Sequence, residues 1–208
     1  MPPTVEDLQA IWRFTYSRSS LLDAKNFLGQ LSEVAPELGV LTPESLRYRA
    51  LVEAAVVSYG RPFTTCYLPP KRKVKPLGDV SPPQHLAQFH NDALILRDKM
   101  VGHKDATPAE GYTWSPNIVV VRIYPDGDFS LNATMLGQME PSMKRGLTEL
   151  CDHFVKHCEA SLSGLRGRYV PELMKNPVGQ YELVIAEPPA AWLTPFQTKH
   201  GDDFRVAD

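Results

Sequence analysis

Hydrophobic residues recur at steps of three and four along the first part of the chain, which is the spacing of an amphipathic helix. Helix-forming residues predominate from Val5 to Glu33, and no further proline occurs until Pro36. One or two helices are therefore expected over this stretch. The predicted core positions are Leu21, Ala24, Leu28 and Leu31.

A second helix is expected to begin at Thr42, because a threonine followed by proline and glutamate is a helix start signal. The run LRYRALVEAAVVSY keeps apolar residues at short intervals until Gly60 and Pro62 interrupt it. This pattern predicts a buried helix that ends in SYGRPF, residues 58–63.

The next stretch, TTCYLPPKRKVKPLGDVSPP at residues 64–83, holds five prolines and four basic residues. Proline interrupts regular structure, so an exposed loop is expected here. Its basic core PKRKVK also resembles a nuclear import signal, and a loop that contacts phosphate groups is the remaining alternative.

A third helix is predicted from near Ser81 to about Val101, because apolar residues again recur at helical spacing. After a polar loop to Pro116, two β-branched and aromatic runs flank Pro-Asp-Gly-Asp, which predicts a β-hairpin. A helix over 142–169 and a strand over 180–187 follow. The predicted stripe of the third helix is Leu86, Phe89, Ala93, Leu96 and Met100.

These elements predict a mainly α protein, a helical bundle with a small antiparallel β hairpin or sheet appended in the C-terminal half. A length of 208 residues favours one domain. We expect a single domain over residues 1–208, with a helical core roughly over 5–105 and 140–175, β additions roughly over 117–135 and 180–187, and a flexible tail roughly over 196–208.

Composition narrows the function classes only slightly. Hydrophobic residues make up 43% and charged residues 22%, as in ordinary folded proteins. The net charge of −2 means that contact with nucleic acid would need a local basic cluster. Three cysteines without a CxxC pair indicate reduced thiols in a cytoplasmic protein, and no apolar run reaches the roughly 20 residues that span a membrane.

The stretch CDHFVKHC, residues 151–158, suggests a zinc site because His153 and His157 are four residues apart on a helix. The angular count instead places Cys151 and Cys158 on the apolar stripe and both histidines to one side. Buried thiols are therefore expected, with no metal and no cofactor. Hydrolase and phosphate-loop motifs of the GxSxG and GxxxxGK types do not occur.

The end of the third predicted helix, LRDKMVGHKD, combines Arg97, Asp98 and His103. Counting ~100° per residue places His90 and Arg97 on one line beside the apolar stripe. Arg97 is therefore expected to be partly buried and to need a carboxylate, phosphate or carbonyl partner.

These residues also have a purely structural interpretation. Gly102 can turn the chain at the helix end, so spacing alone leaves open whether Arg97 and His103 meet. In the structural interpretation Arg97 ties the helix to a neighbour and Asp98 is solvated. His103 or Lys104 then meets the last carbonyls of the helix.

The pattern at this helix end resembles the motif of the HEPN superfamily. It consists of an arginine followed by a polar residue, and of a histidine that five residues separate from the arginine. The stretch HNDALILRDKMVGHKD looks most like the branch with abortive-infection and toxin-type proteins. The SYGRPF helix end looks like what that branch places before this helix. The resemblance covers roughly Ser58 to Asp105.

This resemblance implies a bundle that forms homodimers and joins two copies of the motif in one cleft. Active members are metal-independent endoribonucleases, and others are non-catalytic nucleotide- or protein-binding modules. It implies that Arg97 holds the scissile phosphate, that His103 exchanges protons with the 2′-hydroxyl or the leaving oxygen, and that Asp98 orients one of them. The implied partners are RNA or a nucleotide, and an antitoxin protein.

Histidine and arginine suit this chemistry, because cleavage by a 2′-hydroxyl needs a proton acceptor near neutral pH and a fixed positive charge. Two aromatic residues in the following loop either stack on unpaired bases or pack over the bundle end. The candidate binding residues are His90, Asn91, Lys99, Lys104, Arg61, Tyr112 and Trp114.

Overall fold

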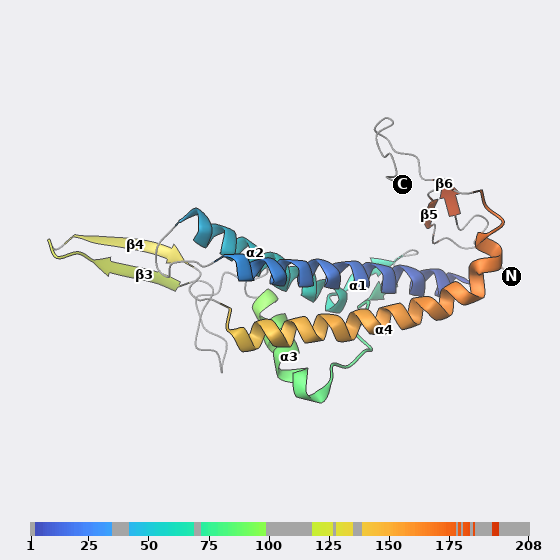
Figure 1. Cartoon of the computed structure of the whole chain (residues 1–208), viewed down its shortest axis with the longest axis horizontal. Helices are drawn as coiled ribbons and strands as arrows, with labels where there is room; N and C mark the ends of the chain where they lie inside the picture. Colours follow the sequence, from blue (N-terminus) through green and yellow to red (C-terminus); the bar gives the residue numbers. More distant parts are fainter. Residues whose placement is uncertain are drawn as a thin grey trace.

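The described part of the chain is mainly helical with short antiparallel strand pairs, which confirms the predicted fold class. Helix α1 packs against both α2 and α4, and α3 packs against α2 and α4 (Figure 1). The computed structural model describes residues 3–34, 42–68, 72–98, 118–126, 128–134, 139–177, 179, 181–183, 185 and 193–195.

Two helices begin where local side chains satisfy their free backbone N–H groups. Helix α1 spans Val5–Gln30, and the Thr4 side chain accepts a hydrogen bond from the backbone of Asp7. Helix α2 spans Pro43–Gly60 and is capped in the same way by Thr42, as predicted. A 3-10 turn continues each of them, Leu31–Glu33 after α1 and Arg61–Phe63 after α2.

Helix α3 is shorter at its start than predicted. It spans Ala87–Arg97, preceded by a 3-10 turn in which the Leu86 N–H donates to the Pro83 carbonyl at 2.9 Å. The prediction from Ser81 was wrong because Pro82 and Pro83 lack N–H groups and push the residue before each of them out of the helical region. The predicted continuation to Val101 lies outside the described residues.

Helix α4 spans Pro141–Leu173 and includes the whole predicted helix over 142–169. It runs antiparallel to α1. Two ion pairs between the helices show this direction, because a step of seven residues forward on α1 matches a step of seven residues backward on α4. Arg18 contacts Glu159 at 3.0 Å, and Lys25 contacts Asp152 at 2.6 Å. These pairs lie at the surface beside the contact between α1 and α4.

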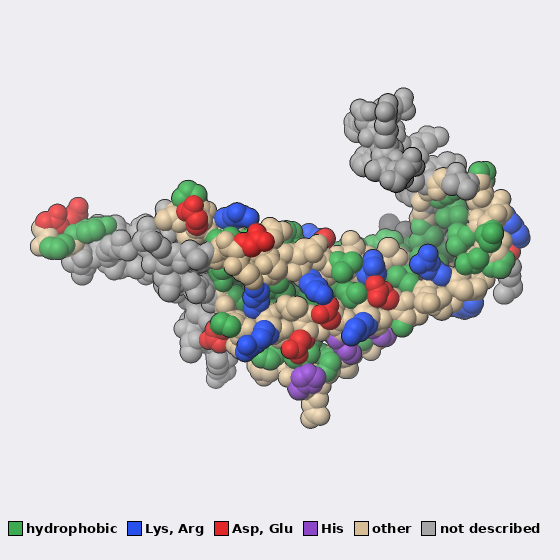
Figure 2. All heavy atoms as spheres, viewed as in Figure 1, with side chains coloured by type: hydrophobic (Ala, Val, Ile, Leu, Met, Phe, Trp, Pro, Cys, Tyr) green, Lys and Arg blue, Asp and Glu red, His purple; other side chains and the backbone are tan. Residues whose placement is uncertain are grey.

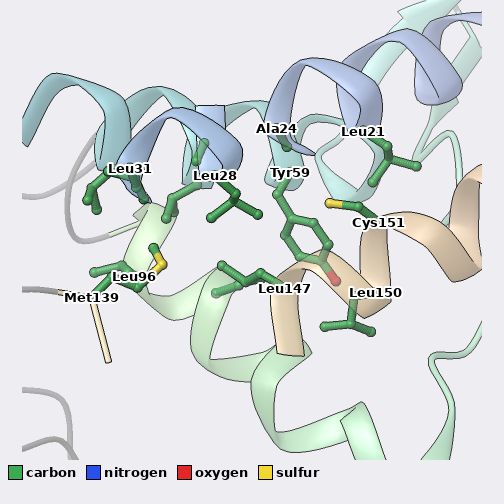
Figure 3. Packing of buried hydrophobic residues seen from close by; sticks show 14 of the residues in the cluster. Leu21, Ala24, Leu28, Leu31, Tyr59, Leu96, Met139, Leu147, Leu150 and Cys151 are labelled. Carbon is green, nitrogen blue, oxygen red and sulfur yellow. The ribbon is translucent and has the colours of Figure 1, made fainter. Parts of the chain in front are cut away.

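The core lies where the four helices meet. The Tyr59 side chain of α2 is fully buried and lies between α1 and α4, beside Leu147 and Leu150 (Figure 3). The four core positions predicted between residues 5 and 33 are all buried, and Phe89 of the α3 stripe is partly buried. The other described residues of that stripe, Leu86, Ala93 and Leu96, are buried.

The stretch predicted as an exposed loop forms a small β-hairpin. Strand β1, Cys66–Leu68, pairs antiparallel with β2, Arg72–Val74. Composition suggested a loop because the prolines dominate it, but Leu68 is only 2% exposed, and Leu77 is fully buried in the core of the bundle. Burial of these two side chains stabilises a pairing that local propensity does not favour.

Two further strand pairs lie in the C-terminal half, where a hairpin and one additional strand were predicted. Strands β3, Ile118–Ile123, and β4, Phe129–Thr134, form the expected hairpin, which projects from one end of the bundle (Figure 1). The strand predicted over 180–187 appears as β5, Tyr181–Leu183, and pairs with β6, Leu193–Pro195. The predicted tail over 196–208 lies outside the described residues.

Charges are mixed over the face of the bundle that Figure 2 shows. Basic and acidic side chains alternate along the face that Figure 2 shows, without a large area of one sign. Of the helices in the described ranges, none has the length and apolar character needed to cross a membrane.

Candidate functional site

Arg97 is the last residue of α3, and its side chain lies across the end of α2. A Cβ atom added to Gly60 would lie 3.0 Å from Cγ and 3.4 Å from Cδ of Arg97. The missing side chain at Gly60 therefore leaves room for the arginine stem. The Arg97 side chain is 28% exposed, which confirms the predicted partial burial.

The Arg97 guanidinium ends at the surface, beside a carboxylate of the same chain. Its Nη1 lies 2.5 Å from Oδ1 of Asp98, whose side chain is 62% exposed. Water screens a pair of this kind, so it contributes about 0–1 kcal/mol to stability. Arg97 can thus exchange Asp98 for another anion at small cost.

His90 lies two turns before Arg97 and is held by the same end of α2. Its Nδ1 shares a 2.7 Å hydrogen bond with the Tyr59 hydroxyl. The His90 ring packs edge-on against Phe63, with 4.7 Å between ring centroids. Burial lowers the pKa of His90 and raises the pKa of the Tyr59 hydroxyl, so both groups are held in their neutral forms near pH 7.

The lowered pKa of His90 predicts that stability falls as the pH drops below about 6.5, the ordinary histidine value. In that range the unfolded chain binds a proton more readily than the folded chain does, so protonation favours unfolding. Denaturant unfolding at pH 7.5 and pH 5.5 measures the loss. The loss of stability between these two pH values should be smaller in His90→Gln than in wild type. It should be unchanged in His85→Gln, which replaces an exposed histidine. Equal losses in both variants would contradict the assignment of the pH dependence to His90.

The structure thus brings SYGRPF together with residues 90–98, the described part of the second stretch on which the HEPN resemblance rests. Tyr59, Gly60 and Phe63 belong to SYGRPF, and each contacts either His90 or Arg97 of α3. The sequence did not identify Tyr59 or Gly60 as partners. The only available signal was their position in SYGRPF, because Tyr59 lies 31 residues before His90 and Gly60 lies still farther from Arg97 along the chain.

The other candidate residues divide into two groups. Asn91 and Arg61 are exposed, Asn91 on α3 and Arg61 directly after α2. His103, which completes the motif, lies outside the described residues, as do the remaining candidates Lys99, Lys104, Tyr112 and Trp114.

The CDHFVKHC stretch of α4 forms part of the core. Cys151 and Cys158 are fully buried together with Phe154, as predicted. Burial raises the pKa of the Cys151 thiol to about 12 and that of Cys158 to about 11, so both remain protonated and are poor metal ligands. Within the described ranges, no three His, Cys, Asp or Glu residues are grouped so that they could hold a metal ion.

The chain was compared with protein-family models, with curated proteins and with solved structures, and none of the three comparisons finds a match.

Proposed function

We propose that this protein is a HEPN-like, metal-independent endoribonuclease that works as a homodimer in a defence or toxin–antitoxin system. The observation that carries the proposal is the placement of Arg97. Its stem is held against Gly60, its guanidinium reaches the surface, and its carboxylate partner is exposed.

Arg97 has the chemistry needed to hold a phosphodiester. A guanidinium donates two parallel hydrogen bonds to a phosphate, and such charge-assisted bonds are roughly twice as strong as neutral ones. The phosphate would replace Asp98 at the guanidinium. Asp98, released but still adjacent, is then available to accept a hydrogen bond from the 2′-hydroxyl or from the imidazole of His103.

In the proposed reaction the 2′-oxygen of RNA attacks phosphorus, and the bond from phosphorus to the 5′-oxygen breaks. A base, proposed to be His103 of one protomer, accepts the 2′-hydroxyl proton. The leaving 5′-oxygen takes a proton from an acid, proposed to be the second copy of His103. Arg97 offsets the negative charge that builds up on the phosphate oxygens. The products are a 2′,3′-cyclic phosphate and a free 5′-hydroxyl.

The homodimer is proposed to form through the outer face of α3. Asn91, Ile95 and Asp98 lie on one side of this helix at steps of four and three residues. Ile95 is 39% exposed there, an apolar side chain beside the motif. Sedimentation velocity at tens of micromolar should give twice the 23.3 kDa chain mass; a monomer would remove the two-copy site.

The test of the function is cleavage of a single-stranded RNA in EDTA, with the product ends identified by mass spectrometry. Wild-type protein should release 2′,3′-cyclic phosphate ends. Arg97→Ala should lower the rate by about 10²-fold or more, the usual scale for removing one charge-stabilising donor. Arg145→Ala removes an exposed arginine elsewhere, on α4, and should keep full activity. Cleavage that requires added divalent metal, or that survives in Arg97→Ala, would contradict the proposal.

A second candidate function is a non-catalytic module that binds a nucleotide or a protein. It is favoured by the partners that Arg97 and His90 already have in their own chain, Asp98 and Tyr59. In that case wild-type protein would not cleave RNA, and Arg97→Ala would only lower the melting temperature.

A further inference from the structure

The β1–β2 hairpin places Cys66, Leu68, Arg72 and Val74 on one face and Tyr67 and Lys73 on the other. Leu68 is 2% exposed, and Cys66 and Val74, which pair across the strands, are both partly buried. Tyr67 alternates with these residues and points the other way, where it is 68% exposed. Its cross-strand partner is Lys73, which is also exposed.

Tyr67 and Lys73 therefore lie side by side on the outer face. Directly opposite residues of an antiparallel pair have Cβ atoms about 4.5–5.5 Å apart. An aromatic ring next to a cation offers a stacking surface and a charge at the same place. Among the large hydrophobic side chains in the described part of the chain, only Met174 is more exposed than Tyr67.

The segment that follows the hairpin is fixed to the bundle. The Leu77 N–H donates to the Pro62 carbonyl at 2.8 Å. The Arg13 guanidinium of α1 donates to the Pro76 carbonyl at 2.8 and 3.0 Å and contacts Asp79 at 2.9 Å. These bonds, together with the buried Leu68, hold the hairpin at a set position. Its outer face thus adjoins a segment that is anchored to the bundle.

The hairpin region is strongly basic in a chain whose net charge is −2. From Arg61 to Asp79 the sequence holds five basic residues and a single acidic one. That acidic residue, Asp79, is already paired with Arg13. Lys73 and Lys75 are both exposed, so their positive charge faces solvent.

We propose that the outer face of the β1–β2 hairpin binds single-stranded RNA, with Tyr67 stacking on a base and Lys73 and Lys75 contacting phosphates. This inference rests on the proposed function and supplies it with a substrate-binding surface. The combination of a protruding aromatic ring and adjacent cations is how proteins bind unpaired strands without reading their sequence. An anionic membrane surface would need only the lysines, and a single tyrosine offers little apolar area for insertion.

The test is fluorescence anisotropy with a labelled single-stranded oligonucleotide whose riboses carry 2′-O-methyl groups, which block cleavage by the 2′-hydroxyl. Tyr67→Ala should weaken binding about tenfold, and Tyr67→Phe should bind nearly as tightly as wild type because the ring is kept. Lys73→Ala should weaken binding and lower the slope of log affinity against log salt by about 0.7, the value for one phosphate contact on a single strand. Lys156→Ala removes an exposed lysine of α4 as the matched control and should leave both quantities unchanged.

Wild-type affinity in both Tyr67→Ala and Lys73→Ala would overturn the inference. If these variants keep wild-type RNA binding but lose binding to vesicles of anionic lipid, the inference is also overturned. The hairpin would then be assigned to a membrane surface. A failure of the proposed nuclease function would give a different result from a failure of the hairpin inference. If wild-type protein binds the blocked oligonucleotide through Tyr67 but never cleaves unmodified RNA, the hairpin assignment stands and the nuclease assignment falls.

Discussion

Replacing His103 by alanine is expected to lower the rate of single-stranded RNA cleavage by about 10²-fold or more. The imidazole is the proposed group that exchanges protons near neutral pH, and alanine can neither accept nor donate one. The rate should be measured in EDTA under single-turnover conditions, so that binding and product release do not mask the chemical step.

Three controls separate chemistry from folding. The exposed His85 precedes α3, and His85→Ala should cleave like wild type. Thermal melts recorded beside the rates should show that His103→Ala keeps the wild-type stability. Added imidazole should restore part of the lost rate in His103→Ala and none in Arg97→Ala. Unchanged cleavage in His103→Ala would show that this histidine is structural.

Adding one methyl group at Gly146 is expected to destabilise the protein by about 1–3 kcal/mol, the usual cost of overpacking a core. Gly146 is buried on α4, where a Cβ atom would lie 2.5 Å from Cγ and 2.6 Å from Cδ2 of Phe89. These atoms lie at the end of the ring that is attached to Cβ. A small movement of the far end of the Phe89 ring therefore cannot relieve the clash. Either Phe89 or the whole of α3 must shift.

Gly164 provides the matched control, because it lies on the same helix and a Cβ atom there would meet nothing within 4 Å. Gly164→Ala should stabilise the protein by about 0.5–1 kcal/mol through the lower conformational entropy of its unfolded state. Denaturant unfolding of both variants should therefore give changes of opposite sign. Changes of the same sign and size would contradict the close α3–α4 packing. Since α3 also carries Arg97, Gly146→Ala should lower RNA cleavage as well.

Much of the helical framework follows from local sequence. Thr42 caps α2 because its hydroxyl reaches a backbone N–H only three residues away, a contact that any chain with this sequence can form. The burial of Leu21 and Leu28 on α1, and of Cys151 on α4, follows from helical periodicity, since one helix face must meet the core. The partial burial of Arg97 was predictable for the same reason, as it lies beside the apolar stripe of α3.

Tertiary contacts decided the features that local patterns misjudged or did not address. Prolines make residues 64–83 resemble a loop, yet the burial of Leu68 and Leu77 stabilises the β1–β2 hairpin there. The pairing of Tyr59 with His90 and the approach of Gly60 to Arg97 join two helices that periodicity treats separately. Periodicity tells which face of a helix is apolar, but the choice of neighbour depends on how all the faces fill the core together. The sequence alone therefore determined most of the helical framework and placed Arg97 in the last turns of the third helix, while only the packing of α2 against α3 decided what surrounds that arginine.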